Sequence, residues 1–243
     1  MKKLISPKMQ FLVILILISV LTISKITNKN NITYLALGDG YARGVNSYGI
    51  EEYGYSDYFR DELQKKNKLK LYSKAFSKRD ISIKMLKNNI IDNEKQLNNK
   101  TTLYLKEQLQ EADIISLSVG LNDLKYAIML EENMTYEKLD RILNSIEKDY
   151  DELIKEIKKY YKHDIYVIGY PINYLESYYI SMGIRRLNNY LNHKEEITFI
   201  SVDLLETDKN KYFSNPISNY PNREGYLVLS NEIYEKYQKK LAK

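Results

Sequence analysis

The 243-residue chain contains no cysteine, no tryptophan and only two histidines. Without cysteine it can form no disulfide bond, no thiolate metal site and no cysteine nucleophile. The two histidines, His163 and His193, are well separated, and no close cluster of aspartates and glutamates accompanies them. We therefore expect no metal ion and no cofactor. Any histidine base must be one of these two residues.

Strong charge of one sign is also missing. The net charge is +5, and it is spread along the chain without a run of five like charges or an aromatic-basic motif. Nucleic acid is therefore not an expected partner. Hydrophobic residues make up 44% and charged residues 28%, which is typical of one soluble domain joined to one apolar segment.

The long apolar run lies at the N-terminus. Residues 1–8 form a basic leader, 9–25 an apolar segment and 26–31 a polar linker. The apolar core is about 16 residues long, near the lower limit of a membrane span and the upper limit of a signal-peptide core. Neither a small-residue cleavage site nor a lipobox cysteine follows it. We expect an uncleaved signal anchor, with a cleaved signal peptide and a buried helix as alternatives. The basic leader favours a domain outside the cytoplasmic membrane.

From residue 32 onward, strand and helix patterns alternate. Short β-prone runs predict strands over 32–37, 70–76, 113–119, 164–169 and 197–202. Apolar residues at helical spacing predict helices over 136–161 and 225–241, the second with Leu227, Leu229, Ile233 and Tyr237 turned partly inward. This alternation predicts one α/β domain over 32–243, built on a doubly wound parallel sheet.

Three segments follow predicted strands or begin helices in a way that suits the carboxyl edge of such a sheet. Residues 38–44 read Gly-Asp-Gly-Tyr-Ala-Arg-Gly, residues 118–123 read Ser-Val-Gly-Leu-Asn-Asp, and residues 220–226 read Tyr-Pro-Asn-Arg-Glu-Gly-Tyr. In this order and placement they resemble the SGNH (GDSL-type) ester hydrolases. The resemblance covers nearly all of 32–243. It implies a flavodoxin-like fold with three layers, α/β/α.

The same resemblance implies that the catalytic triad is gone. The family's nucleophilic serine corresponds to Gly40, and its histidine corresponds to Tyr220. The family's aspartate corresponds to Ile217 or Ser218, neither of which carries a carboxylate. No catalytic residue is therefore expected to be intact.

Replacement from elsewhere in the chain is limited. His163 and His193 each precede a predicted strand, whereas a doubly wound sheet builds its site at the opposite, carboxyl ends. A six-residue strand spans about 20 Å, so neither imidazole should reach the site. Ser47, Ser77 and Ser218 remain as candidates for a non-standard nucleophile.

The resemblance implies that part of the oxyanion hole is retained. Gly120 and Asn122 match the family's Gly-x-Asn-Asp block, and Asn122 would be the side-chain donor. The second block, Ser-Lys-Arg-Asp at 77–80, lacks the family's glycine and instead brings Arg79 to the rim. The alternative role for Asn122 and Asp123 is to cap a helix and fix a loop. The expected ligand-contacting residues are Asp39, Gly40, Arg79, Gly120, Asn122 and Tyr220.

Tyrosines are concentrated after the first motif, at Tyr48, Tyr53, Tyr55 and Tyr58. Because tyrosine combines an apolar ring with a polar tip, these residues suit a half-buried rim, or contact with a sugar or lipid.

Three functions stay open. The leading hypothesis is a membrane-anchored, extracytoplasmic protein that binds an acylated glycan, lipid or peptide without hydrolysing it, in a cleft widened by loss of the serine. The second is an active ester hydrolase with a non-standard nucleophile. The third is a structural or interaction module, which a filled site at Gly40 would favour.

Overall fold

The computed structural model describes residues 31–98, 101–173 and 175–242. The basic leader, the apolar segment and most of the linker predicted from the sequence lie outside these residues. Within the described part of the chain, no helix is both long enough and apolar enough to cross a membrane.

Five parallel strands form the central sheet, in the order β2-β1-β5-β6-β7. They are β1 (Ile32–Gly38), β2 (Leu69–Ser73), β5 (Ile114–Ser118), β6 (Ile165–Ile168) and β7 (Ile197–Ile200). Each lies within a few residues of a predicted strand. The chain passes from β1 outward to β2 and then returns to the other side of β1, so the strand order reverses between β1 and β5. In open α/β sheets, sites form at this switch point.

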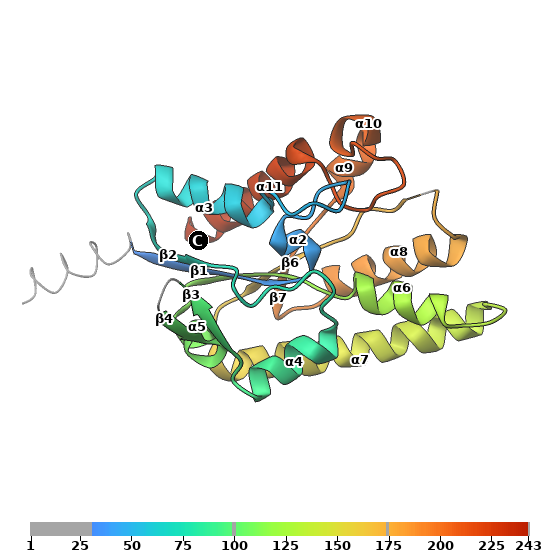
Figure 1. The fold of residues 1–243 in the computed structure, drawn as a ribbon, viewed down its shortest axis with the longest axis horizontal. Helices are drawn as coiled ribbons and strands as arrows, with labels where there is room; N and C mark the ends of the chain where they lie inside the picture. The colour runs from blue at the N-terminus through green and yellow to red at the C-terminus, as the bar shows by residue number, and fades with distance from the viewer. Residues whose placement is uncertain (1–30, 99–100, 174, 243) are drawn as a thin grey trace, which may run out of the picture.

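Helices cover both faces of the sheet (Figure 1). One face carries α2 (Gly40–Arg43), α3 (Tyr55–Lys65), α9 (Asp203–Thr207), α10 (Lys209–Tyr212) and α11 (Arg223–Leu241). The other carries α4 (Ile83–Ile91), α5 (Leu105–Glu111), α6 (Leu121–Met129), α7 (Tyr136–Tyr160) and α8 (Tyr178–Asn192). The α/β architecture is therefore confirmed. An antiparallel hairpin of β3 (Lys95–Asn98) and β4 (Thr101–Tyr104) was not predicted.

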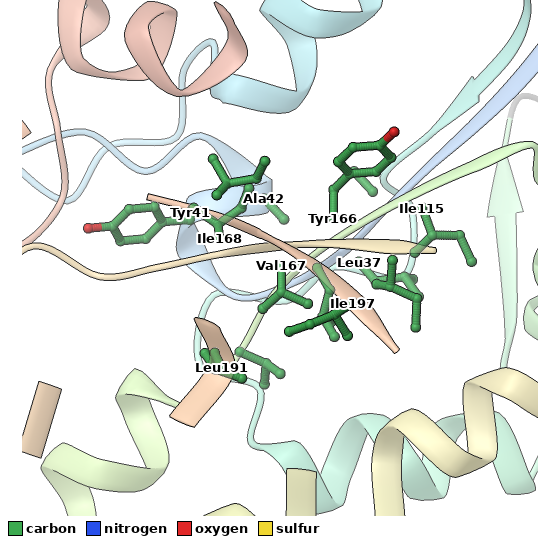
Figure 2. Packing of buried hydrophobic residues seen from close by; sticks show 14 of the residues in the cluster. Leu37, Tyr41, Ala42, Ile115, Tyr166, Val167, Ile168, Leu191 and Ile197 are labelled. Atoms are coloured by element: carbon green, nitrogen blue, oxygen red, sulfur yellow. The ribbon is translucent and has the colours of Figure 1, made fainter. Parts of the chain in front are cut away.

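The sheet is buried on both faces. All seven residues of β1 are buried, which explains why it reads as a continuous apolar run and not as an alternating one. Figure 2 shows the alternation of side chains along β6: Tyr166 and Ile168 point toward the face that carries α2, and Val167 points to the opposite face. One strand thus contributes to both halves of the core.

The two predicted helices are present, with one error in orientation. In α7 the six apolar residues at helical spacing are all buried; they are Leu139, Leu143, Ile146, Leu153, Ile154 and Ile157. Helix α11 starts two residues earlier than predicted, because Asn222 caps it through the backbone N–H groups of Glu224 and Gly225. Leu227 is 45% exposed, so its predicted inward orientation is wrong. The buried face of α11 runs instead through Tyr226, Leu229 and Ile233.

The end of β1 passes very close to the end of β5. Gly38 has a φ of +125°, and a Cβ atom there would lie 1.8 Å from the carbonyl oxygen of Ser118. The backbone N–H of Asp39 donates to that same oxygen at 2.7 Å. Glycine at 38 therefore allows the two strands to deliver residues 39 and 119 side by side.

Gly38→Ala should lower the free energy of unfolding by about 3 kcal/mol or more, because both the φ angle and the backbone contact exclude a side chain. Gly49→Ala is the matched control: its φ is also positive, but its added Cβ would meet only the movable Arg79 side chain. That control should cost about 1–2 kcal/mol. Urea denaturation of both variants measures the difference, and equal costs would contradict this account of the crossing.

Candidate active-site position

The turn after β1 is organised by the carboxyl group of Asp39, which is 2% exposed. Its Oδ1 accepts a hydrogen bond from the backbone N–H of Tyr41 at 3.0 Å and so caps α2. Its Oδ2 accepts from the Tyr170 hydroxyl at 2.7 Å. The backbone N–H of Ala42 donates to the Ser118 hydroxyl at 3.2 Å. The turn after β1, the last residue of β5 and the segment after β6 are thereby joined at the carboxyl edge of the sheet.

Burial raises the pKa of Asp39 to about 6. The hydrogen bonds from Tyr170, Ser118 and the Tyr41 N–H oppose this rise but do not cancel it. A carboxyl group with such a pKa changes its protonation between weakly acidic and neutral pH. The turn therefore holds a proton in acid and a buried negative charge near pH 8.

Tyr220 fills the position above Gly40. A Cβ atom built on Gly40 would lie 2.6 Å from both Cε1 and the hydroxyl oxygen of Tyr220. The expectation that loss of the serine widens the floor of the cleft is therefore wrong, because the tyrosine ring takes up the space. Gly40 and Tyr220 are thus brought together as the motifs predict, but as a packed contact.

The loop that carries Tyr220 is fixed through its main chain. The Ser47 hydroxyl donates to the carbonyl oxygen of Tyr220 at 2.7 Å, and the Tyr220 N–H donates to the Ser218 hydroxyl at 3.0 Å. The Tyr220 ring also packs on Tyr41, with 5.5 Å between ring centroids. Ile217 is 67% exposed. The two positions proposed for the family's aspartate thus hold an exposed apolar side chain and a hydroxyl bonded to the backbone.

Further buried tyrosines surround this contact. The Tyr41 hydroxyl donates to the carbonyl oxygen of Asn219, and the Tyr226 hydroxyl donates to that of Val45. The Tyr41 ring lies edge-on to both Tyr170, at 5.2 Å, and Tyr226, at 5.9 Å. This cluster was not predicted from the sequence, although Tyr41 and Tyr226 lie within the first and third motifs.

The candidate nucleophiles Ser47 and Ser77 both donate hydrogen bonds to backbone carbonyl groups. Besides the Ser47 contact, the Ser77 hydroxyl donates to the carbonyl oxygen of Ala36 at 2.9 Å. His163 follows α7, His193 ends α8, and both are exposed at the amino edge of the sheet. In residues 31–98, 101–173 and 175–242, no serine hydroxyl is hydrogen-bonded to a histidine ring.

Asn122, at the start of α6, donates through its side-chain amide to the carbonyl oxygens of Arg79 at 3.1 Å and Ile81 at 3.4 Å. The neighbouring Asp123 carboxylate accepts from the backbone N–H of Ile83 at 3.1 Å. Both side chains thus fix the loop between β2 and α4. Burial raises the pKa of Asp123 to about 6. Gly120 precedes them with a φ of +115° and caps α6.

The side chains predicted on the rim of the site, Arg79 and the tyrosines after the first motif, differ in their exposure. The Arg79 side chain is exposed and lies over Gly49, where an added Cβ would be 2.6 Å from its Nη2 atom. Tyr48 and Tyr53 are 67% and 50% exposed. Tyr55 is fully buried, so its predicted place on the rim is wrong; it starts α3 and points into the core.

A polar network that the sequence did not predict adjoins Tyr220. The Lys125 ammonium donates to the carboxylate of Glu176 and to the side-chain oxygen of Asn219. The Asn219 amide in turn donates to Glu176 at 3.2 Å. These three residues tie α6 to the loops that follow β6 and precede α11. Their positions, 125, 176 and 219, carry no shared motif, so only the fold reveals them.

The open space lies beyond Asn122. A groove of about 850 Å³ runs between α4, α6 and α7. Asp80, Ser82 and Asn122 are among its lining residues. Tyr220 and Gly40 do not line this groove. The closed position above Gly40 and the open groove are therefore two separate features of the same edge of the molecule.

Comparison with known proteins bears on the fold of the chain. No family model matches the chain, and no curated protein matches it. The lipase Lip_vut3 from a goat rumen metagenome has a similar structure, with a TM-score of 0.68 and 17% identity, covering 84% of this chain and 96% of the lipase. A putative GDSL-like lipase from Parabacteroides merdae matches with a TM-score of 0.58 and 15% identity, covering 85% and 95%.

A catalytic mutant of an acetylxylan esterase from Geobacillus stearothermophilus also matches, with a TM-score of 0.57 and 16% identity over 84% of this chain and 93% of the esterase. The chain therefore has the α/β fold of the GDSL-type lipases and SGNH acetylxylan esterases over most of its length. The resemblance inferred from the three motifs is confirmed at the level of the fold.

The raised pKa of Asp39 predicts a pH-dependent stability. Protonation of Asp39 is favoured in the folded state. The contribution of this carboxyl group to the free energy of unfolding is therefore complete below pH 3.8 and is lost as the pH rises through about 6. This carboxyl group alone should lower the free energy of unfolding by about 1 kcal/mol between pH 5 and pH 8. Asp39→Asn should remove that part of the slope, as urea denaturation at the two pH values would measure. An unchanged slope in the variant would contradict the assignment.

The contact between residues 40 and 220 should appear as a coupling energy. Gly40→Ala alone should destabilise the protein by about 1–3 kcal/mol, because the methyl group collides with the Tyr220 ring. In a Tyr220→Ala background the same change should cost little or stabilise α2, since the space is then empty. A double-mutant cycle in urea should therefore give a coupling of about 1 kcal/mol or more. Additive effects would show that the ring does not occupy this space in solution.

Proposed function

We propose that this protein uses the SGNH hydrolase fold to bind a ligand and does not hydrolyse esters. The observation that carries the proposal is the Tyr220 ring packed on Gly40. Ester hydrolysis on this fold needs a nucleophile, a base, a carboxylate that orients the base, and donors for the oxyanion. Position 40 offers no side chain, and the space in which one would act is filled.

Tyr220 is unsuited to replace the base. Burial raises the pKa of its phenol well above the ordinary value, so the hydroxyl stays protonated and neutral at physiological pH. Asn122 would be the oxyanion donor by resemblance, but it donates instead to the loop at Arg79 and Ile81. These contacts support a site in which structural hydrogen bonds have replaced the catalytic ones.

A filled position above Gly40 also fits a purely structural module. The groove beside Asn122 is the specific observation that favours ligand binding, because cavities of several hundred Å³ are the usual size of small-molecule sites. The sequence of residues 9–25 supports a location at the cytoplasmic membrane, with the domain outside it. On this proposal, the ligand binds next to the former catalytic position and not over it.

Purified protein should turn over p-nitrophenyl acetate and butyrate no faster than the same protein after heat denaturation. A serine-directed fluorophosphonate probe should leave it unlabelled. Turnover above this background that Asn122→Ala abolishes would contradict the proposal, because the site would then be an active hydrolase with another nucleophile.

Gly40→Ser/Tyr220→His/Ser218→Asp should gain measurable turnover if the surrounding frame is preserved. The matched control is Gly40→Ala/Tyr220→His/Ser218→Asp, which differs by one hydroxyl group and should stay inactive. Activity in both variants would mean that the turnover does not depend on a serine at position 40.

A further inference from the structure

One wall of the groove is a single face of α7. The six α7 residues that line it are Lys138, Arg141, Ile142, Ser145, Ile146 and Asp149. Their spacing of three and four residues places them on one side of the helix. From Lys138 to Asp149 this wall extends about 16 Å, at 1.5 Å per residue. The groove is therefore elongated, and its length suits a chain more than a compact ring.

Large apolar side chains of the other two helices that line the groove are exposed. Met85 of α4 is 50% exposed, and Tyr126 and Met129 of α6 are 62% and 78% exposed. The half-buried Ile142 and the buried Ile146 of α7 also line the groove. Methionine is flexible and polarisable and fits itself to irregular apolar partners. Together these residues form a surface suited to a flexible hydrocarbon chain.

Most charges around the groove are already neutralised. Lys84 pairs with Asp149 at 3.3 Å, and Lys138 pairs with Glu131 at 2.9 Å. Lys125 is bound by Glu176, as described above. Arg141 is the exception among the lining cations: it is exposed, and no described residue forms an ion pair or a hydrogen bond with its guanidinium group.

Two lining charges without an ion-pair partner, Asp80 and Arg141, make different parts of the groove favour different ligand charges. Asp80 follows Arg79, whose carbonyl oxygen accepts from Asn122, and it too has no ion-pair partner among the described residues. Lys84, four residues after Asp80, pairs with Asp149, so this part of the groove adjoins Asp149. Arg141 is eight residues before Asp149 on α7, about 12 Å away along the helix. An acidic group would be repelled at the Asp80 end and attracted at the Arg141 end. A guanidinium group binds carboxylates and phosphates through paired hydrogen bonds.

We propose that this groove binds a single-chain amphiphile with an acidic head group, such as a fatty acid or a lysophospholipid. The hydrocarbon chain lies over Met85, Met129 and Ile142, and the carboxylate or phosphate pairs with Arg141. The inference deepens the proposed function, since it names the ligand class of the groove beside the former catalytic position. A volume of about 850 Å³ lies within the usual range of small-molecule sites.

The test uses the full chain in isolated membranes, without detergent. Three diazirine-labelled probes carry the same myristoyl chain: myristate, myristoyl-lysophosphatidylglycerol and the uncharged monomyristoylglycerol. After irradiation, mass spectrometry maps the cross-linked peptides and gives the probe concentration at half-maximal labelling. We expect saturable labelling of peptides that contain Met85 or Met129 by at least one acidic probe, with a half-maximal concentration about tenfold below that of the uncharged probe.

Arg141→Gln should raise the half-maximal concentration for the acidic probes about tenfold and leave that for monomyristoylglycerol unchanged. Met129→Glu should abolish groove labelling by all three probes. Leu227→Glu is the matched control, because it also places a charge at an exposed apolar position, on α11, and should have no effect. Limited proteolysis checks that each variant keeps the fold.

The two acidic probes separate the two sources of the ligand, since a fatty-acid site favours myristate and a lysophospholipid site favours the phosphate probe. Labelling that does not saturate, that maps elsewhere, or that ignores Arg141→Gln would overturn the inference. Release of myristate from the phosphate probe is measured in the same samples. Such release would contradict the proposed loss of hydrolysis and leave the mapped binding site as a separate result.

Discussion

The carboxyl edge of this domain depends on the turn that follows β1, and that turn depends on a buried carboxyl group. Asp39 caps α2 and receives the Tyr170 hydroxyl, while Gly38 lets β1 approach the backbone of β5. Because these contacts fix the backbone at residues 38–42, they also fix the position from which a side chain at residue 40 would project. The rest of the site is arranged around that point.

Two residues at this point are complementary in shape. A residue with a side chain at 40 would need the space that the Tyr220 ring occupies, and a smaller residue at 220 would leave a void over Gly40. Neighbouring residues also fix the position of Tyr220: Ser47 and Ser218 form hydrogen bonds with its main chain, and Tyr41 packs on its ring. On the proposed function, packing and hydrogen bonds to the backbone stand where the chemistry expected of the fold would lie.

The structure has a filled position and an open groove near each other. The space above Gly40 is occupied by the Tyr220 ring, whereas the groove along α7 is open and is lined in part by Asn122 and Asp123. Those two residues fix the loop between β2 and α4, which borders both features. On the proposed function, a ligand in the groove would lie beside the position of Gly40, and Arg141 would be the charged group that selects it.

The sequence by itself determined the α/β class, the five parallel strands, helices α7 and α11, and the positions of the three motifs. These follow from local periodicity and from glycine and asparagine at the ends of strands and helices, which act over a few residues. It also placed Gly40 and Tyr220 in one site, because motifs at the carboxyl ends of parallel strands meet. Only the tertiary structure decided that Tyr220 fills the space over Gly40, that Tyr55 is buried, that Leu227 faces outward, and that Lys125, Glu176 and Asn219 form one network. Those outcomes depend on side chains from distant segments competing for the same volume, and no local pattern in the sequence records that competition.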